Sequence, residues 1–262
     1  MKRELLTHGD ALIDVVIDDA GGSRETLVLL PSSQRDSMDF TDVAERFADL
    51  GFRVLRPQPR GMGRSSPPPA DMTLHTLAAD VACVINQLGG GKAIIAGHAF
   101  GHYVARVTDL DHPASVRGVV MLAAAARELP AGLSASLDIA ADNDRSEIER
   151  LMHLQKAFFA PGNDASLWLN GWYPQWRKPY RQAAVTPPKD QWWPMSNAPI
   201  LDLQGAQDPW RPRATEFELQ DKLGDKVSIC VIDGASHALL PEQPGAVIAA
   251  ITEWVGSLPG ER

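Results

Sequence analysis

One short turn in this sequence has the frame of a catalytic motif, with alanine at the position of the reacting residue. Gly97-His98-Ala99-Phe100-Gly101 matches both glycines of G-x-S-x-G, the pattern of a nucleophile elbow. The preceding residues 93–96 form a short apolar run typical of a buried strand, and residues 103–107 continue with helical character. A strand, a sharp turn and a helix are therefore expected in the required order. Ala99 occupies the nucleophile position, although its methyl group cannot attack a substrate.

A carboxylate and an imidazole follow further along the chain, each after a predicted strand. Asp208 comes after the apolar residues 200–203, and His237 comes after residues 227–232. A carboxylate that accepts a hydrogen bond from an imidazole orients that imidazole as a general base. Taken alone, either residue would be interpreted as structural, so the assignment depends on their order and context. Asp202, inside a predicted strand, and Glu128 are weaker alternatives for the acid.

With elbow, acid and histidine in this order, the chain resembles the α/β-hydrolase superfamily over nearly its whole length. The resemblance implies that Asp208 orients His237 and that His237 acts as general base toward position 99. It also implies an oxyanion hole formed by the backbone N–H groups of Phe100 and Ser33. The loop that holds Ser33 departs from the His-Gly usual in the superfamily, and helix capping is the alternative role for its two serines.

The elements that must position these residues alternate between strand and helix. Strands are predicted at residues 26–30, 52–55, 93–96, 116–122, 200–203 and 227–232, and helices at 40–50, 74–88, 103–110, 214–223 and 241–255. This alternation predicts an α/β fold, here the α/β-hydrolase fold, with a mostly parallel central sheet and helices on both faces. The Pro/Gly-rich loop at 57–69 contains Arg60–Ser65, which resembles the R-G-x-G-x-S loop of the superfamily. We interpret it as structural rather than phosphate-binding.

Residues 127–195 interrupt the alternation and are predicted to form an inserted cap, with residues 1–126 and 196–262 as the hydrolase core. Five of the seven tryptophans lie in this interval. Large aromatic side chains can wall an apolar ligand pocket, and they can equally build the core of a small cap. His102 flanks the elbow and is a further candidate for contact with the pocket. The residues predicted to bind substrate are His98, Trp172, Trp176 and Trp210.

Composition narrows the classes of partner. The chain has 262 residues and a formal net charge of −8, which does not suit a nucleic-acid partner. It shows no apolar run of membrane-spanning length and no signal-like start, so we expect no membrane partner and a cytoplasmic location. A small-molecule substrate and no cofactor are expected. No metal is expected either, because no set of possible ligands has metal-site spacing. Cys83 and Cys230 are expected to be reduced thiols, and the oligomeric state is not predicted.

Three functions fit these residues. The first is a hydrolase acting on an ester, a lactone or an activated C–C bond of a small apolar or aromatic substrate. In it Ala99 is either an engineered replacement of serine or the native residue, with the Asp208/His237 pair acting as base. The second is a cofactor-independent lyase or proton-transfer enzyme that uses the same pair. The third is a non-catalytic ligand-binding homologue that has kept the pocket.

Overall fold

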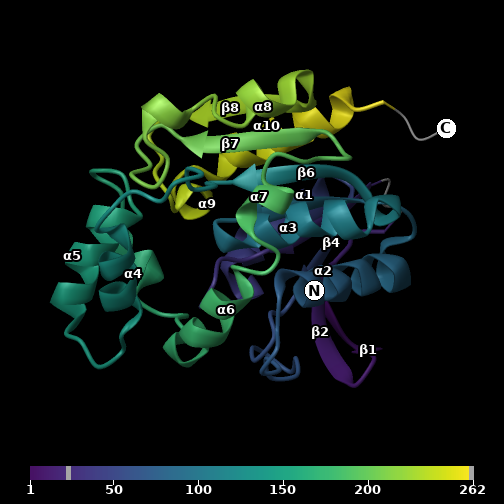
Figure 1. Ribbon diagram of the computed structural model, residues 1–262, viewed down its shortest axis with the longest axis horizontal. Helices are drawn as coiled ribbons and strands as arrows, with labels where there is room; N and C mark the ends of the chain where they lie inside the picture. The colour runs from purple at the N-terminus through teal and green to yellow at the C-terminus, as the bar shows by residue number, and fades with distance from the viewer. Residues whose placement is uncertain (22–24, 260–262) are drawn as a thin grey trace.

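Eight strands form one sheet in the computed structural model, which describes residues 1–21 and 25–259. Their order is β1-β2-β4-β3-β5-β6-β7-β8, and all pairs from β4 to β8 are parallel. This confirms the mostly parallel sheet predicted from the sequence (Figure 1). The bounds are β1 Lys2–His8, β2 Ala11–Asp18, β3 Glu25–Leu30, β4 Phe52–Pro57, β5 Ala93–His98, β6 Val116–Leu122, β7 Ile200–Gly205 and β8 Val227–Ile232.

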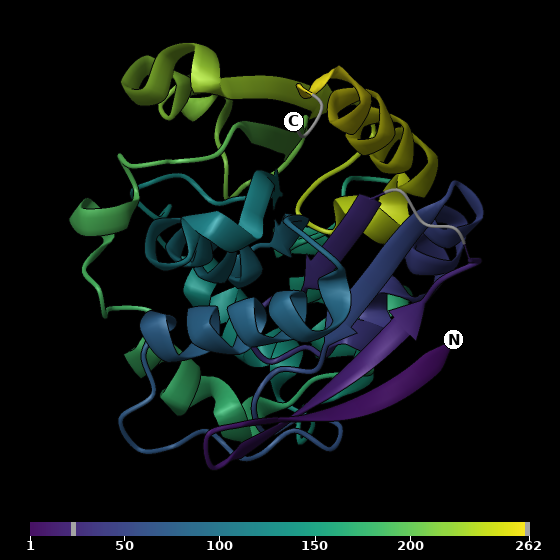
Figure 2. The ribbon, with the colours of Figure 1, turned by 90° about the vertical axis from the view of Figure 1, so that its right-hand side faces the viewer.

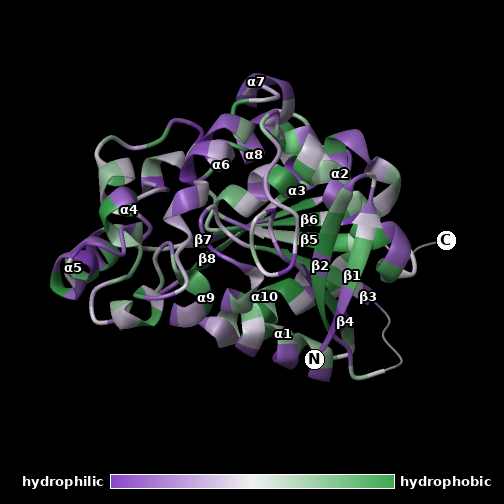
Figure 3. Cartoon of the chain, turned by 90° about the horizontal axis from the view of Figure 1, so that it is seen from below, coloured by the Kyte–Doolittle hydropathy of each residue, from purple (hydrophilic) through white to green (hydrophobic). Residues whose placement is uncertain are grey.

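Helices cover both faces of the sheet, as predicted (Figure 3). The bounds are α1 Thr41–Asp49, α2 Leu74–Val84, α3 Phe100–Asp111, α4 Leu133–Ala141, α5 Glu147–Ala157, α6 Arg177–Ala183, α7 Lys189–Trp192, α8 Gln220–Leu223, α9 Leu239–Glu242 and α10 Pro244–Ser257. Successive strand residues point to opposite faces, so Val28 and Ile95 pack in the core under α2 and α3. Leu27 and Ile94 pack in the core under α1 and α10.

An N-terminal hairpin that the sequence analysis did not predict extends one edge of the sheet. β1 and β2 pair in antiparallel register around a turn at Gly9, and β2 then pairs in antiparallel register with β4. Figure 2 shows this hairpin at the edge opposite β7 and β8. Two buried carboxylates interrupt the apolar pattern of β2: Asp14 lies 2.8 Å from Arg64, and Asp18 lies 2.8 Å from Arg56. Buried charges require such partners. Because both arginines are distant in sequence, the local pattern of apolar and polar residues does not identify β2 as a strand.

The helix predicted at 214–223 is not continuous. A 3₁₀ turn at Arg213–Thr215 and the short α8 at Gln220–Leu223 stand in its place. The Glu216 carbonyl oxygen accepts a hydrogen bond of 2.9 Å from the Gln204 side-chain amide, so it is occupied by a side chain instead of continuing a helix. The last predicted helix is likewise divided, since Pro244 starts α10 and lacks the N–H that would join it to α9.

The segment between β6 and β7 carries α4, α5, α6 and α7. In Figure 1, α4 and α5 lie beyond the ends of β6, β7 and β8, away from the sheet. An arginine joins this segment to the loop after β3: the Arg35 guanidinium lies 4.7 Å from the ring centroids of both Trp168 and Trp172. Arg35 also pairs with Asp39, so its charge is neutralised where it is buried. None of the helices within the described ranges is long and apolar enough to span a membrane.

Candidate active site

The elbow has the sharp backbone geometry that its sequence predicts. β5 ends at His98, Ala99 has φ 46° and ψ −114°, and α3 starts at the next residue. Positive φ in a non-glycine residue is strained by about 1–3 kcal/mol and persists only where the surroundings enforce it. Here close backbone packing around the flanking glycines enforces the strained conformation of Ala99. A Cβ on Gly97 would lie 2.3 Å from the Gly101 carbonyl group, and one on Gly101 would lie 2.3 Å from the Leu30 oxygen.

The predicted acid and base meet on this side of the sheet. His237 Nδ1 lies 2.9 Å from Asp208 Oδ2, and the other carboxylate oxygen accepts a hydrogen bond of 2.8 Å from the Trp210 backbone N–H. Asp208 is 4% exposed and His237 is 5% exposed, so water competes little for this contact. Because an ionised carboxylate only accepts, Nδ1 carries the proton and Nε2 keeps a free lone pair. An imidazole held in this way can accept a proton at Nε2.

The loop that carries His237 is fixed from two directions. Gly205, at the end of β7, touches the Ser236 carbonyl so closely that a Cβ there would lie 2.3 Å from its oxygen. On the other side, His98 Nε2 donates a hydrogen bond of 2.8 Å to the His237 carbonyl oxygen. Burial, aided by the neighbouring His237, lowers the pKa of His98 to about 3, so its ring is neutral near pH 7. His98 therefore fixes the backbone of His237 through this hydrogen bond.

A cavity of about 170 Å³ opens over Ala99 and His237. Ser33 and Phe100 both line it, and their backbone N–H groups have no acceptor in the part of the chain that the structure describes. Free N–H groups beside the elbow are what an oxyanion hole requires. The rest of the lining is mainly aromatic and apolar, with Tyr103, Phe158, Trp168, Trp172 and Trp210 among it.

The residues expected to bind substrate divide into two groups. Trp172 and Trp210 line the cavity, whereas His98 and Trp176 are not among its lining residues. The Trp176 indole instead donates a hydrogen bond of 2.9 Å to the Gly61 carbonyl. Phe158 and Trp168 also line the cavity, and neither was among the residues predicted to bind substrate, although Trp168 is one of the tryptophans expected to be able to wall a pocket. Trp168 lies four residues before Trp172, a helical spacing that could have linked the two to one surface.

The alternative acids are placed elsewhere. Asp202 is fully buried within β7, where its Oδ2 lies 2.8 Å from Arg211. Burial raises the pKa of Asp202, and the Arg211 guanidinium opposes that rise. Glu128 is exposed on the segment after β6. Of the carboxylates considered, Asp208 is the one that contacts His237.

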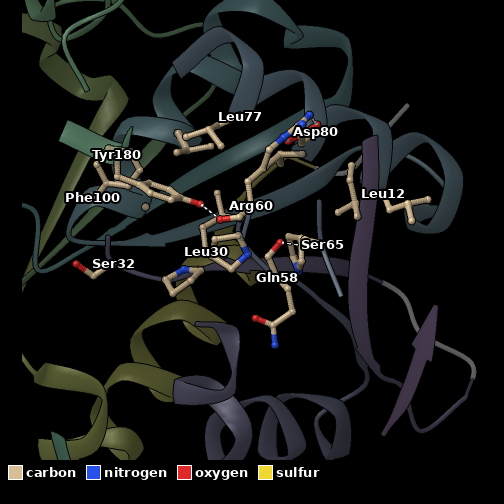
Figure 4. Close-up of a pocket in the computed structure, with 17 residues that line it drawn as sticks. Leu12, Leu30, Ser32, Gln58, Arg60, Ser65, Leu77, Asp80, Phe100 and Tyr180 are labelled. Carbon is tan, nitrogen blue, oxygen red and sulfur yellow. Dashed lines mark hydrogen bonds and ion pairs between the residues drawn. The ribbon is translucent and has the colours of Figure 1, made fainter. Parts of the chain in front are cut away.

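A second, smaller cavity of about 50 Å³ lies against the loop that follows β3 (Figure 4). It shares Ser32 and Phe100 with the cavity over the elbow, but neither Ala99 nor His237 lines it. Its lining includes the Arg60 side chain, which pairs with Asp80 at 2.7 Å.

The Arg60–Ser65 loop is held by contacts within the protein. Ser65 Oγ donates a hydrogen bond of 2.8 Å to the Gln58 carbonyl oxygen, and Tyr180 donates one of 3.0 Å to the Arg60 carbonyl oxygen. The Arg64 guanidinium pairs with the buried Asp14. Within the described ranges, no group of three or more His, Cys, Asp and Glu side chains could hold a metal ion.

The fold and this site define a class of protein. The α/β hydrolase fold family matches residues 26–168, more than half of the sequence, and the chain belongs to that family.

Curated relatives match a shorter stretch. Bifunctional epoxide hydrolase 2 of Sus scrofa is 36% identical over 77 residues, which are 29% of this chain and 14% of that protein. Epoxide hydrolase A of Mycobacterium tuberculosis is also 36% identical over 77 residues, or 24% of its length. Among solved structures, a thermophilic esterase from Thermogutta terrifontis superposes with a TM-score of 0.78 at 22% identity, over 98% of this chain and 99% of that one. The structural likeness shows the fold, and the chain matches only 14% and 24% of the length of the two curated relatives.

Proposed function

We propose that this protein is a hydrolase that cleaves an ester, a lactone or an activated C–C bond of a small aromatic or apolar substrate. In the proposed reaction, the Asp208/His237 pair activates water directly. The observation that carries the proposal is the Asp208–His237 hydrogen bond, with His237 and Ala99 lining the same cavity. Residues 127–195 act as a cap in this proposal, because Trp168 and Trp172 from that segment wall the cavity.

For an ester, the proposed chemistry proceeds without a covalent enzyme intermediate. His237 Nε2 takes a proton from water as the water oxygen bonds to the substrate carbonyl carbon. The carbonyl oxygen becomes an oxyanion, which the N–H groups of Phe100 and Ser33 stabilise. As the C–O bond to the leaving group breaks, the protonated His237 returns the proton to that alkoxide. Asp208 stays ionised and stabilises the imidazolium between the two transfers.

The size and character of the cavity limit the substrate. A dry cavity of about 150 Å³ accommodates a benzene ring, and the cavity here measures about 170 Å³. Aromatic walls favour flat, apolar groups through edge-to-face and stacking contacts. We therefore propose a single-ring substrate with small substituents.

The test compares the chain as given with Ala99→Ser and His237→Ala on phenyl acetate, small aryl esters and small lactones. Hydrolysis by the Ala99 protein that is lost in His237→Ala, with no acyl adduct in intact-mass spectra, is the expected result. In Ala99→Ser the introduced hydroxyl group should form a transient acyl adduct, since nucleophile and base then act together. Turnover that appears only in Ala99→Ser would refute water activation and identify a serine hydrolase that has lost its nucleophile.

A second candidate rests on the free Nε2 lone pair of His237. With a methyl group at position 99, this base can face the substrate itself, and proton abstraction would then support a lyase or a proton-transfer reaction. Running the reaction in ¹⁸O-labelled water separates the two candidates, since hydrolysis incorporates the label into the acid product and elimination does not. Saturable binding without any turnover would favour a ligand-binding protein instead.

A further inference from the structure

A second buried histidine lies beside the elbow and takes no part in the proposed reaction. His102 is 2% exposed, and its Nδ1 hydrogen bonds to the carbonyl oxygen of Ala99. A carbonyl oxygen can only accept, so Nδ1 carries the hydrogen. Burial holds the pKa of His102 well below its usual range, and the nearby Arg106 guanidinium adds to this effect. The ring is therefore neutral, and its Nε2 keeps an unshared lone pair.

That lone pair is unused within the protein. His102 Nε2 makes no hydrogen bond to any residue in the described ranges, and it is not among the side-chain atoms sealed from solvent. His102 lines the cavity together with Ala99 and His237. Its ring packs edge-on against Tyr103, with centroids 4.6 Å apart, which leaves the imidazole little freedom to turn away. The cavity is thus lined by two imidazoles whose Nδ1 atoms are engaged by Asp208 and by the Ala99 carbonyl oxygen, and whose Nε2 atoms have no partner within the described ranges.

Several other polar groups of the cavity have a role in the proposed reaction or a partner in the protein, and the hydroxyl groups of Ser32, Ser33 and Tyr103 also line it. His237 Nε2 is the base, and the N–H groups of Ser33 and Phe100 face the developing oxyanion. The Arg35 guanidinium is engaged by Asp39 and by the Asn170 carbonyl oxygen. A carbonyl group of the substrate cannot satisfy His102, because two acceptors do not bond. The remaining acceptor calls for a donor on a different part of the substrate.

We propose that His102 Nε2 is a binding subsite for a hydroxyl group carried on the aromatic ring of the substrate. The inference rests on the proposed function for the reacting bond and adds the substrate class, a hydroxyl-bearing aromatic compound. A ligand that fills the cavity excludes water from this acceptor, so a ligand that supplies the missing hydrogen binds more tightly than a matched ligand that cannot. His102 is a positioning residue, because it holds the hydroxyl group on the ring, whereas the reacting bond of the substrate lies near Ala99 and His237.

The test is a binding experiment that needs no turnover. Phenol and anisole differ by the donor hydrogen, since the methyl ether keeps the ring and the oxygen. Their dissociation constants are measured by quenching of tryptophan fluorescence, because Trp168, Trp172 and Trp210 line the cavity. We expect phenol to bind about tenfold more tightly than anisole to the unmodified chain, the factor given by one hydrogen bond to a buried acceptor.

Two variants separate the subsite from a purely structural role. His102→Phe keeps a flat ring against Tyr103 and removes the acceptor, so the phenol preference should disappear. His102→Gln keeps a side-chain acceptor and should retain most of the preference. His153→Phe is the matched control, because His153 Nδ1 contacts Ser136 in the segment between β6 and β7 and His153 is not a cavity-lining residue. If His102→Phe does not fold, as judged by circular dichroism, His102→Leu replaces it.

Each outcome decides the proposal. An unchanged phenol preference in His102→Phe overturns it and directs the hydroxyl to His237 instead. Absence of phenol binding to the unmodified chain, or equal affinity for phenol and anisole, also overturns it. The proposed hydrolysis is judged separately. If no ester is cleaved but the preference depends on His102, the subsite stands and the reaction fails. If aryl esters are cleaved without such a preference, the reaction stands and the subsite fails.

Discussion

Substitution of Gly101 by alanine tests whether close backbone contact shapes the elbow. The new Cβ would lie 2.3 Å from the Leu30 carbonyl oxygen and 2.8 Å from that of Pro31, where real Cβ contacts stay beyond 3.0 Å. Relief requires a shift of about 0.7 Å in backbone atoms, because no flexible side chain is available to move. Leu30 lies in β3, which pairs with both β4 and β5, so the neighbours resist that shift.

We expect a cost near the upper end of the range for overpacking, about 3 kcal/mol. For a chain of this size, such a loss lowers the melting temperature by roughly 6–12 °C. Thermal unfolding followed by circular dichroism measures the change and needs no knowledge of the substrate. The same shift would move the loop that carries Ser33, so any hydrolysis should fall along with stability.

Gly256→Ala is the matched control for this experiment. Gly256 is exposed in α10, has no atom within 4 Å of an added Cβ, and lies in a helix. Alanine there should raise the melting temperature by about 2 °C, because it restricts the unfolded chain and favours helix. If Gly101→Ala melts within about 2 °C of the unmodified chain, the close packing of the elbow against β3 is refuted.

The remaining predictions concern the charged groups around the base. Asp208→Asn should lower the hydrolysis rate by about 10⁴ at nearly unchanged melting temperature, because His237 loses its orienting acceptor; a loss below about tenfold would contradict this role. Asp202→Asn should do the reverse, destabilising the fold by about 1–3 kcal/mol in urea titrations, because Arg211 loses its buried partner at 2.8 Å while it keeps Glu218 at 3.1 Å. His98 has a folded-state pKa of about 3, below the ordinary 6.5, so the stability it contributes is complete above pH 6.5 and is lost as the pH falls toward 3. His98→Gln should therefore show a shallower loss of urea stability on acidification, and an identical pH slope in both proteins would exclude this linkage.

The parts of the fold that the sequence predicted are those governed by local pattern. The run at 93–96 followed by Gly97 and Gly101 specified strand, turn and helix, because both glycines face backbone at close range. The positions of Asp208 and His237 followed from the strands before them, since parallel strands deliver their ends to one edge of the sheet. Their hydrogen bond joins the ends of β7 and β8, which are neighbours in the sheet.

What the sequence did not predict depends on partners distant in the chain. β2 was missed because Asp14 and Asp18 point inward, and Arg64 and Arg56, which donate hydrogen bonds to them, lie about 40–50 residues away in sequence, outside any periodic pattern. Trp176 was expected in the pocket but packs on Gly61 instead, a contact between the segment after β6 and the loop after β4. Which face of an inserted segment turns inward is decided by such non-local contacts, and no local period encodes them.

The bent backbone at position 99 has an evolutionary consequence. The conformation is imposed by Gly97, Gly101 and the strand behind them, so it holds with a methyl side chain and does not depend on a hydroxyl. Alanine and serine differ by one oxygen atom, and their codons can differ by a single nucleotide. Under the proposed function, one mutational step would therefore exchange covalent for water-mediated catalysis without a change in the turn, the base or the cavity. In this chain, the fold therefore does not depend on which of the two residues occupies position 99.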